Sequence, residues 1–214
     1  MDQHDPESND HGLLTDGPLP PAGSSTVGRI RDLVYRVILR WRYPSVQFGA
    51  RTRFIGFPIF DIDPRGAFVI GDDVTFVSTP RRNMIGLTKR CSIFVGPGAR
   101  LEIGPRTGLS GVSIYCSKSV TIGAFVNCGG NVSIWDTDFH PLETLSRRRH
   151  DRDAIRSAPV QIGDDAFIGA HALVLKGVTV GAESVIAAGS VVTKPIPQRE
   201  IWGGNPARLI RRLG

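Results

Sequence analysis

His140 stands where a regular repeat of residues in the chain breaks off. Counting in sixes from Ile122 reaches Cys128, Ile134 and then His140, whereas the following segment HPLETLSRRRHDRDAIRS fits no period of six. Functional residues are common where a rigid scaffold gives way to a loop. A neutral imidazole there can accept the proton of a hydroxyl near neutral pH. We therefore predict a protruding loop over residues 140–158, with His140 as a catalytic base at its start.

Two carboxylates, Asp136 and Asp138, precede this histidine. Either could orient the imidazole or hydrogen-bond an acceptor molecule, and solvated turn carboxylates are the equal alternative. No serine or cysteine stands in a recognisable nucleophile motif, so the chemistry does not require a covalent enzyme intermediate. The plain alternative for His140, which is followed by Pro141, is an ordinary turn residue.

The residues that must position this histidine belong to a repeat of six. Its clearest run is a set of aliphatic anchors at Ile162, Ile168, Val174, Val180, Ile186 and Val192. Mostly small residues follow four positions later, at Ala166, Ala172, Val178, Ser184, Ser190 and Ile196. A period of six fits neither the 3.6-residue helical turn nor the simple alternation of a strand. It predicts a solenoid that turns a corner every six residues around a narrow core.

Glycine follows three of these anchors directly, at Gly163, Gly169 and Gly181. We expect these glycines to tolerate the unusual backbone angles of the corners. Weaker copies of the repeat begin at Ile70-Gly71, and the broken register between them predicts small insertions in the early coils.

The chain divides into four segments. Residues 1–25 are rich in Asp, Pro, Gly and Ser and predict a disordered tail. Residues 26–47 predict a basic amphipathic helix with a linker, residues 48–200 the coil, and residues 201–214 a C-terminal segment. The helix could pack its apolar stripe on the main domain or on a neighbouring subunit, or attach to an anionic membrane surface.

The composition limits the class of protein. A chain of 214 residues with three cysteines and no CxxC pair predicts one domain without a disulfide framework, in the cytoplasm. The net charge of +6 favours an anionic partner: a nucleic acid, an anionic lipid or a phosphorylated small molecule. We expect no nucleic acid, because no recognised motif accompanies the charge. A place at the inner face of the membrane is the alternative location.

Three stretches, NVSIWDTDFHP, the run from Ile162 and GGNPARLIRR, resemble the hexapeptide-repeat acyltransferase superfamily. The similarity covers about Gly66 to Leu213 and is greatest to sugar O-acetyltransferases of the maltose, galactoside and surface-polysaccharide (colanic-acid-like) type. It implies an all-β fold, a left-handed parallel β-helix. Together with the N-terminal amphipathic helix predicted above and a C-terminal helix, this completes the expected fold. The resemblance also implies a homotrimer whose active sites lie between neighbouring subunits.

The same resemblance places the family's catalytic histidine at His140 and implies acetyl-CoA as co-substrate, with no metal. It matches the family's coenzyme A contacts to Ala170, Ala188, Thr193, Lys194, Arg208 and Arg211. The Ala170 amide is then the candidate donor to the oxyanion, and the basic side chains lie near the phosphates. The plain alternative for RLIRR is a solvated C-terminal helix.

The acceptor implied by the resemblance is a sugar, a nucleotide sugar or a lipid-linked saccharide. The arginine-rich loop could admit a phosphorylated acceptor, and a solvated face is the alternative. Two other classes of protein compete with the enzyme. A zinc protein like the γ-class carbonic anhydrases would use His140, His150 and His171. A non-catalytic β-helix scaffold would not need His140.

Overall fold

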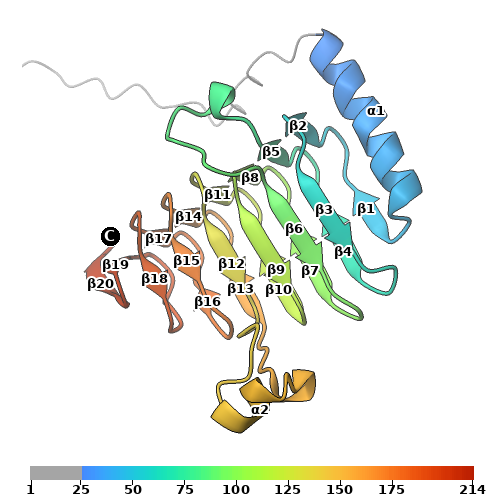
Figure 1. The fold of residues 1–214 in the computed structure, drawn as a ribbon. Helices are drawn as coiled ribbons and strands as arrows, with labels where there is room; N and C mark the ends of the chain where they lie inside the picture. The colour runs from blue at the N-terminus through green and yellow to red at the C-terminus, as the bar shows by residue number, and fades with distance from the viewer. Residues whose placement is uncertain (1–25) are drawn as a thin grey trace, which may run out of the picture.

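Short strands follow one another around the three sides of a prism (Figure 1). The structure, a computed structural model, describes residues 26–214; the predicted disordered tail over residues 1–25 lies outside this range. Sheet A contains β1 (Val46–Phe48), β4 (Ala67–Ile70), β7 (Arg100–Ile103), β10 (Ser119–Ile122), β13 (Val160–Ile162) and β16 (Thr179–Val180). Sheet B contains β2 (Arg53–Ile55), β5 (Thr75–Val77), β8 (Gly108–Ser110), β11 (Asn127–Cys128), β14 (Phe167–Ile168), β17 (Val185–Ile186), β19 (Glu200–Gly204) and β20 (Ala207–Arg212). Sheet C contains β3 (Ile59–Ile62), β6 (Ser92–Val95), β9 (Ser113–Cys116), β12 (Ser133–Trp135), β15 (Leu173–Val174) and β18 (Val191–Val192).

The chain visits sheets A, B and C in turn, so the prism has an A/B edge, a B/C edge and a C/A edge. Strands of successive coils pair in parallel; Ile162 pairs with Val180, and Val174 with Val192, three hexads further along the chain. All six predicted anchors and all six residues four positions after them are buried. The predicted mostly β architecture of stacked coils is confirmed.

The glycines after the anchors are required for a different reason than the one expected. The left-handed backbone angles fall three residues after five of the six anchors, at Asp165, His171, Gly177, Glu183 and Gly189. At Gly169, an added Cβ would lie 2.5 Å from the backbone nitrogen of Ala188 in the next coil. Glycine is therefore needed because successive coils approach too closely for a side chain.

Two insertions leave the coil, on different edges. Residues 79–90, with η1 (Pro80–Arg82), protrude at the B/C edge between β5 and β6. A longer excursion with α2 (Thr144–Arg148) and η2 (Arg152–Ala154) leaves the C/A edge between β12 and β13 (Figure 1). An antiparallel bridge between Thr137 and Ser157 closes its stem. The coil resumes in register after the excursion, since Ile122 pairs with Ile162.

The N-terminal helix α1 (Thr26–Arg42) lies across the first coil, where it contacts β1 and β2 (Figure 1). Its apolar stripe does not pack on the chain's own domain, so that alternative is wrong. The face of the helix that contacts the coil instead contains Asp32, Tyr35 and Leu39. A hydrogen bond from the backbone N–H of Phe54 in β2 to the Asp32 carboxylate helps to hold the helix in place. No helix in the described range is long and apolar enough to span a membrane.

The expected C-terminal helix is also wrong. Strands β19 and β20 form an antiparallel hairpin on the edge of sheet B. The turn between them is formed by Gly204, which has a φ of 101°, and the following Asn205-Pro206. Strand β20 pairs with backbone N–H and C=O groups of β19 that would otherwise be unpaired at the edge of the sheet. The pattern of RLIRR fits a helix as well as a strand, and this tertiary pairing decides between them.

Candidate active site

His140 lies at the C/A edge, at the point where the excursion leaves the coil. The preceding Phe139 has a left-handed φ of 62°, and its ring packs edge-on against Tyr115 at 4.7 Å and Trp135 at 5.3 Å between ring centroids. The His140 backbone N–H donates to the Asp138 carbonyl at 2.7 Å. These contacts among half-buried rings hold the backbone in place, and the His140 side chain is exposed to solvent.

Asp136 is fully buried beneath this turn, and both of its carboxylate oxygens accept hydrogen bonds. Its carboxylate accepts the backbone N–H groups of Ser117, Lys118 and Ser119 at 2.7, 2.6 and 2.8 Å. Burial raises the pKa of the Asp136 carboxyl, and these three amide donors oppose that rise. The side chain thus ties the start of the excursion to the corner of the coil before it, and it presents no free oxygen to an acceptor.

Asp138 is the carboxylate with an oxygen to spare. Its Oδ1 lies 3.0 Å from Nζ of Lys176, and its Oδ2 is buried without a hydrogen-bond partner in the described part of the chain. Sequence reasoning missed Lys176, because only the stacking of coils brings it beneath Asp138. The pairing of β15 with β18 then places Lys194 one coil beyond Lys176 on the same edge.

The predicted coenzyme A contacts Ala170 and Ala188 stack on the B/C edge. Gly189 N–H donates to the Ala170 carbonyl at 2.8 Å, whereas the N–H groups of Ala170 and Ala188 donate no hydrogen bond within residues 26–214. Two unpaired amides beside small side chains suit an extended, amide-bearing ligand. The hairpin places Arg208 at this same edge. Arg208 pairs with Gly203 on the neighbouring strand, and a Cβ added at Gly203 would lie 3.0 Å from the Ala187 Cβ.

The predicted site residues therefore fall on two edges of one chain. His140, Asp138, Thr193 and Lys194 lie along the C/A edge, and Ala170, Ala188 and Arg208 lie along the B/C edge. The whole width of sheet C separates the two groups. Arg211 is apart from both, opposite Ile201 in the hairpin.

A row of aromatic side chains crosses the outer face of sheet C toward His140. Phe94, Tyr115 and Trp135 occupy matching positions on β6, β9 and β12. The Phe94 and Tyr115 rings are stacked at 4.2 Å, and Phe139 closes the row. Burial raises the pKa of the Tyr115 hydroxyl, with Asp61 and Asp136 adding to the rise, so it remains a hydrogen-bond donor at neutral pH.

A row of serines runs beside the aromatic row, two residues earlier on the same strands. The Ser92 and Ser113 hydroxyls lie 3.0 Å apart, and Lys89 Nζ donates to the Ser133 hydroxyl at 3.0 Å. Flat rings beside hydroxyl groups form a surface that can both stack on and hydrogen-bond to a polyhydroxylated ligand.

The cysteines are inert core residues. Burial raises the pKa of Cys116 and of Cys128 to about 12 and also raises that of Cys91. Their thiols are therefore protonated at neutral pH and do not supply the thiolate that a covalent mechanism would need.

The histidines of the zinc alternative lie in separate places. His150 is on the excursion, and His171 is on the B/C edge, where its Nε2 lies 3.3 Å from Nδ2 of Asn131. Within residues 26–214, no group of three or more His, Cys, Asp or Glu side chains is placed to hold a metal ion. The loop arginines Arg147, Arg148, Arg149, Arg152 and Arg156 are all exposed.

The chain matches known proteins in both sequence and fold. The family model for the hexapeptide repeat of succinyl-transferase matches residues 159–194. A hexapeptide-repeat acetyltransferase of Vibrio cholerae, solved with acetyl coenzyme A, superposes with a TM-score of 0.55 at 23% identity, over 88% of this chain and 81% of that one. This likeness concerns the fold.

Two galactoside O-acetyltransferases are similar in sequence. That of Escherichia coli is 34% identical over 122 residues, which is 56% of this chain and 58% of that protein. The chain therefore spans less than two thirds of the Escherichia coli enzyme. That of Lactococcus lactis is 33% identical over 152 residues, which is 65% of this chain and 72% of that protein. The repeat, the fold and the Lactococcus match agree: the chain belongs to the family of hexapeptide-repeat acetyltransferases.

Proposed function

We propose that this protein is an acetyl-CoA-dependent O-acetyltransferase that modifies a hydroxyl group of a saccharide. The observation that carries the proposal is the position of His140, held by Phe139 at the end of an aromatic row, in a chain whose relatives are galactoside O-acetyltransferases. A left-handed turn of the coil is part of this proposal, on the resemblance to the family.

His140 acts as the general base. Bound acetyl-CoA supplies an activated acetyl group as a thioester. The imidazole takes the proton of the acceptor hydroxyl as its oxygen bonds to the acetyl carbon, and returns that proton to the sulfur as the carbon–sulfur bond breaks. The Ala170 N–H stabilises the negative charge that develops on the carbonyl oxygen. Asp138, through its unpaired oxygen, orients the imidazole or the acceptor.

The division of these residues between two edges requires more than one copy of the chain. The Ala170 amide and the His140 imidazole must both reach the reacting carbonyl, yet sheet C separates them in one chain. We infer a homotrimer, as the resemblance to the family implies, in which the B/C edge of one subunit meets the C/A edge of the next; a head-to-tail contact of this kind forms a ring when its rotation closes. The phosphate groups of coenzyme A then lie between Arg208 of one subunit and Lys194 of the next, whereas Arg211 lies apart from them in the hairpin.

The acceptor is proposed to stack on the aromatic row. Phe94, Tyr115 and Trp135 form a surface that ends at His140, and sugar rings present apolar C–H faces to such a surface. A row that crosses three coils suits a nucleotide sugar or a lipid-linked saccharide better than a lone monosaccharide. The exposed arginines of the excursion would then face the phosphates of either acceptor.

Release of coenzyme A in the presence of an acceptor tests the proposal. Thiol appearance is measured with a panel of nucleotide sugars and lipid-linked saccharides, and ester formation by mass spectrometry. We expect His140→Ala to lower kcat by about 10²- to 10⁴-fold with coenzyme A affinity preserved in calorimetry. Arg208→Ala should show the reverse: weaker coenzyme A binding with the base intact.

Four results would contradict the proposal. Unchanged turnover in His140→Ala would remove the base, and stoichiometric zinc in the purified protein would favour the carbonic-anhydrase-like alternative. Absence of coenzyme A binding would favour the non-catalytic scaffold. Full activity of a monomer would contradict the shared site.

A further inference from the structure

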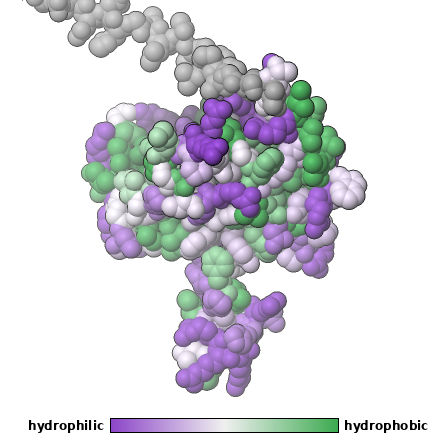
Figure 2. All heavy atoms as spheres, turned by 45° about the horizontal axis from the view of Figure 1, so that its top comes forward, coloured by the Kyte–Doolittle hydropathy of each residue, from purple (hydrophilic) through white to green (hydrophobic). Residues whose placement is uncertain are grey.

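The outward face of α1 is a continuous apolar stripe. Its six side chains recur at positions i, i+3, i+4, i+7, i+8 and i+11, so they lie on one side of the helix. Each of the six is more than half exposed, and Trp41 is 83% exposed. The six residues are Ile30, Leu33, Val34, Val37, Ile38 and Trp41. A monomeric soluble domain rarely leaves so contiguous an apolar patch in water. Figure 2 shows hydrophobic residues gathered along the end of the molecule where α1 lies.

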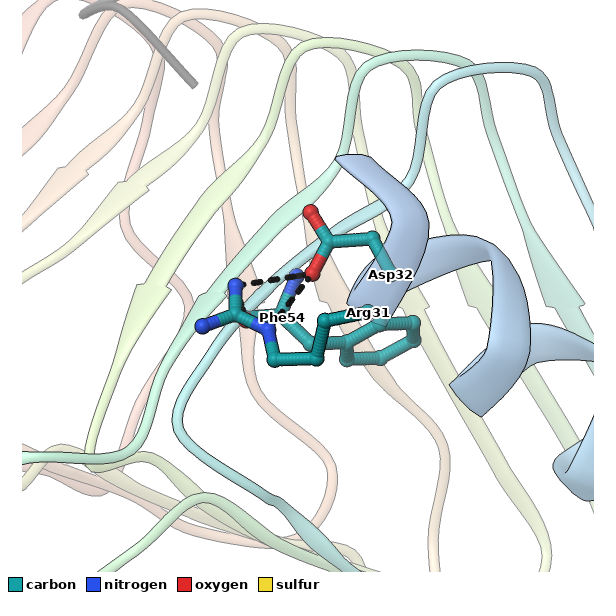
Figure 3. A network of polar contacts seen from close by, with 3 residues as sticks. All are labelled: Arg31, Asp32 and Phe54. Carbon is teal, nitrogen blue, oxygen red and sulfur yellow. Dashed lines mark hydrogen bonds and ion pairs between the residues drawn. The ribbon is translucent and has the colours of Figure 1, made fainter. Parts of the chain in front are cut away.

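The stripe faces outward because the opposite face is fastened to the coil. The Asp32 carboxylate accepts the Phe54 backbone N–H at 3.3 Å and pairs with Arg31 at 2.8 Å, and Arg31 also donates to the Phe54 carbonyl (Figure 3). Tyr35 donates to the Pro58 carbonyl at 2.9 Å and packs edge-on against Phe54. Turning the stripe inward would break all of these contacts. It would also place six apolar side chains against the backbone polar groups of Phe54 and Pro58, which would then lose their hydrogen bonds.

Positive charge borders the stripe on both sides. By the helical period, Arg29 and Arg40 lie along one border and Arg42 along the other, and all three are exposed. Asp32, the sole acidic residue of α1, is turned inward and buried. The outward face is therefore apolar at its centre and cationic at its margins, with no negative charge. Long arginine side chains at such margins can reach the headgroups while the centre enters the lipid.

We propose that α1 docks the protein on an anionic lipid bilayer, lying in the interface with its stripe among the acyl chains. A second copy of the chain is the less suitable occupant, because two such faces would bring their arginines together. The helix also lies at the opposite end of the coil from β19 and β20 (Figure 1), away from Arg208. Trp41, the most exposed residue of the stripe, is of the type enriched at membrane interfaces.

Vesicle binding by the full-length protein tests this proposal. We expect co-sedimentation with phosphatidylcholine vesicles that contain phosphatidylglycerol, weaker binding without phosphatidylglycerol, and a decrease with added salt. Leu33→Glu/Val37→Glu should weaken binding by about tenfold for each side chain, and Arg40→Gln by about fivefold. The tryptophan emission should shift to the blue on binding, and Trp41→Phe should remove the shift.

Met84→Glu is the control, since Met84 lies outside α1 and is even more exposed, at 95%, than Leu33 and Val37; vesicle binding by this variant should equal that of the wild type. The substituted α1 side chains point to solvent, so circular dichroism and the melting temperature should not change. Equal vesicle binding by the double variant would overturn the proposal, as would no binding of the wild type at low salt. A loss of oligomers in the double variant, with no wild-type vesicle binding, would show that the stripe is covered by another copy.

Discussion

At the scale of the residue, three neighbouring polar side chains at the C/A edge differ in burial and in hydrogen-bond partners. Asp136 is buried and holds backbone amides, Asp138 shares its carboxylate with Lys176, and His140 is exposed. Sequence alone presented Asp136 and Asp138 as equivalent. A regular strand would place residues two apart on the same side, so the difference does not come from alternation. It comes from their partners: the Asp136 carboxylate accepts three backbone N–H groups of the preceding coil, whereas the Asp138 carboxylate pairs with Lys176 and keeps one oxygen free.

Lys176 is a positioning residue in this arrangement, since it acts through Asp138. We expect Lys176→Met to lower kcat by about tenfold, because Asp138 loses the cation that fixes one of its oxygens. Lys176→Arg, which keeps a charged donor, should restore most of the activity. Steady-state kinetics with parallel melting curves check this. A loss of activity that follows a loss of stability equally in both variants would indicate a purely structural ion pair.

At the scale of the element, stacking of β6, β9 and β12 turns isolated aromatic residues into a surface. Phe94, Tyr115 and Trp135 are about twenty residues apart in sequence, yet their rings adjoin because parallel coils place equivalent positions side by side. Strand pairing also positions a residue in the hairpin β19–β20, where the pairing of Arg208 with Gly203 places Arg208 at the B/C edge.

Trp135→Ala tests the proposed acceptor surface. The acceptor KM should rise about tenfold, because the ring nearest the end of the row is lost, and the Kd for coenzyme A should not change. Phe125→Ala serves as the control, because Phe125 is an exposed aromatic residue on the A/B edge. Equal acceptor KM values for the wild type and Trp135→Ala would place the acceptor elsewhere.

At the scale of the whole molecule, the buried core couples stability to pH through its thiols. Cys116 and Cys128 have a pKa of about 12 in the folded chain against an ordinary value of 9.0. A thiol with a raised pKa holds its proton more tightly when folded, so ionisation favours the unfolded chain. Stability is therefore unaffected well below pH 9 and falls as the pH rises from about 9 toward about 12.

The expected slope of the free energy of unfolding in this window is about −1.4 kcal/mol per pH unit for each thiol. Denaturant unfolding at pH 8 and at pH 10.5 measures it. The Cys116→Ala/Cys128→Ala variant should lose less stability between these two conditions than the wild type. Parallel pH dependences for the two proteins would contradict the assignment to these thiols.

The sequence by itself determined the coil, because a period of six can be met only by a chain that turns a corner in each hexad, and all six anchors from Ile162 to Val192 are buried as expected. It also marked His140 as the point where the repeat breaks. Tertiary structure alone decided the orientation of α1, the strand pairing of the C-terminal segment, and the contacts among Asp138, Lys176 and the aromatic row. These depend on pairings between distant coils and on competing hydrogen bonds, for which local periodicity carries no signal.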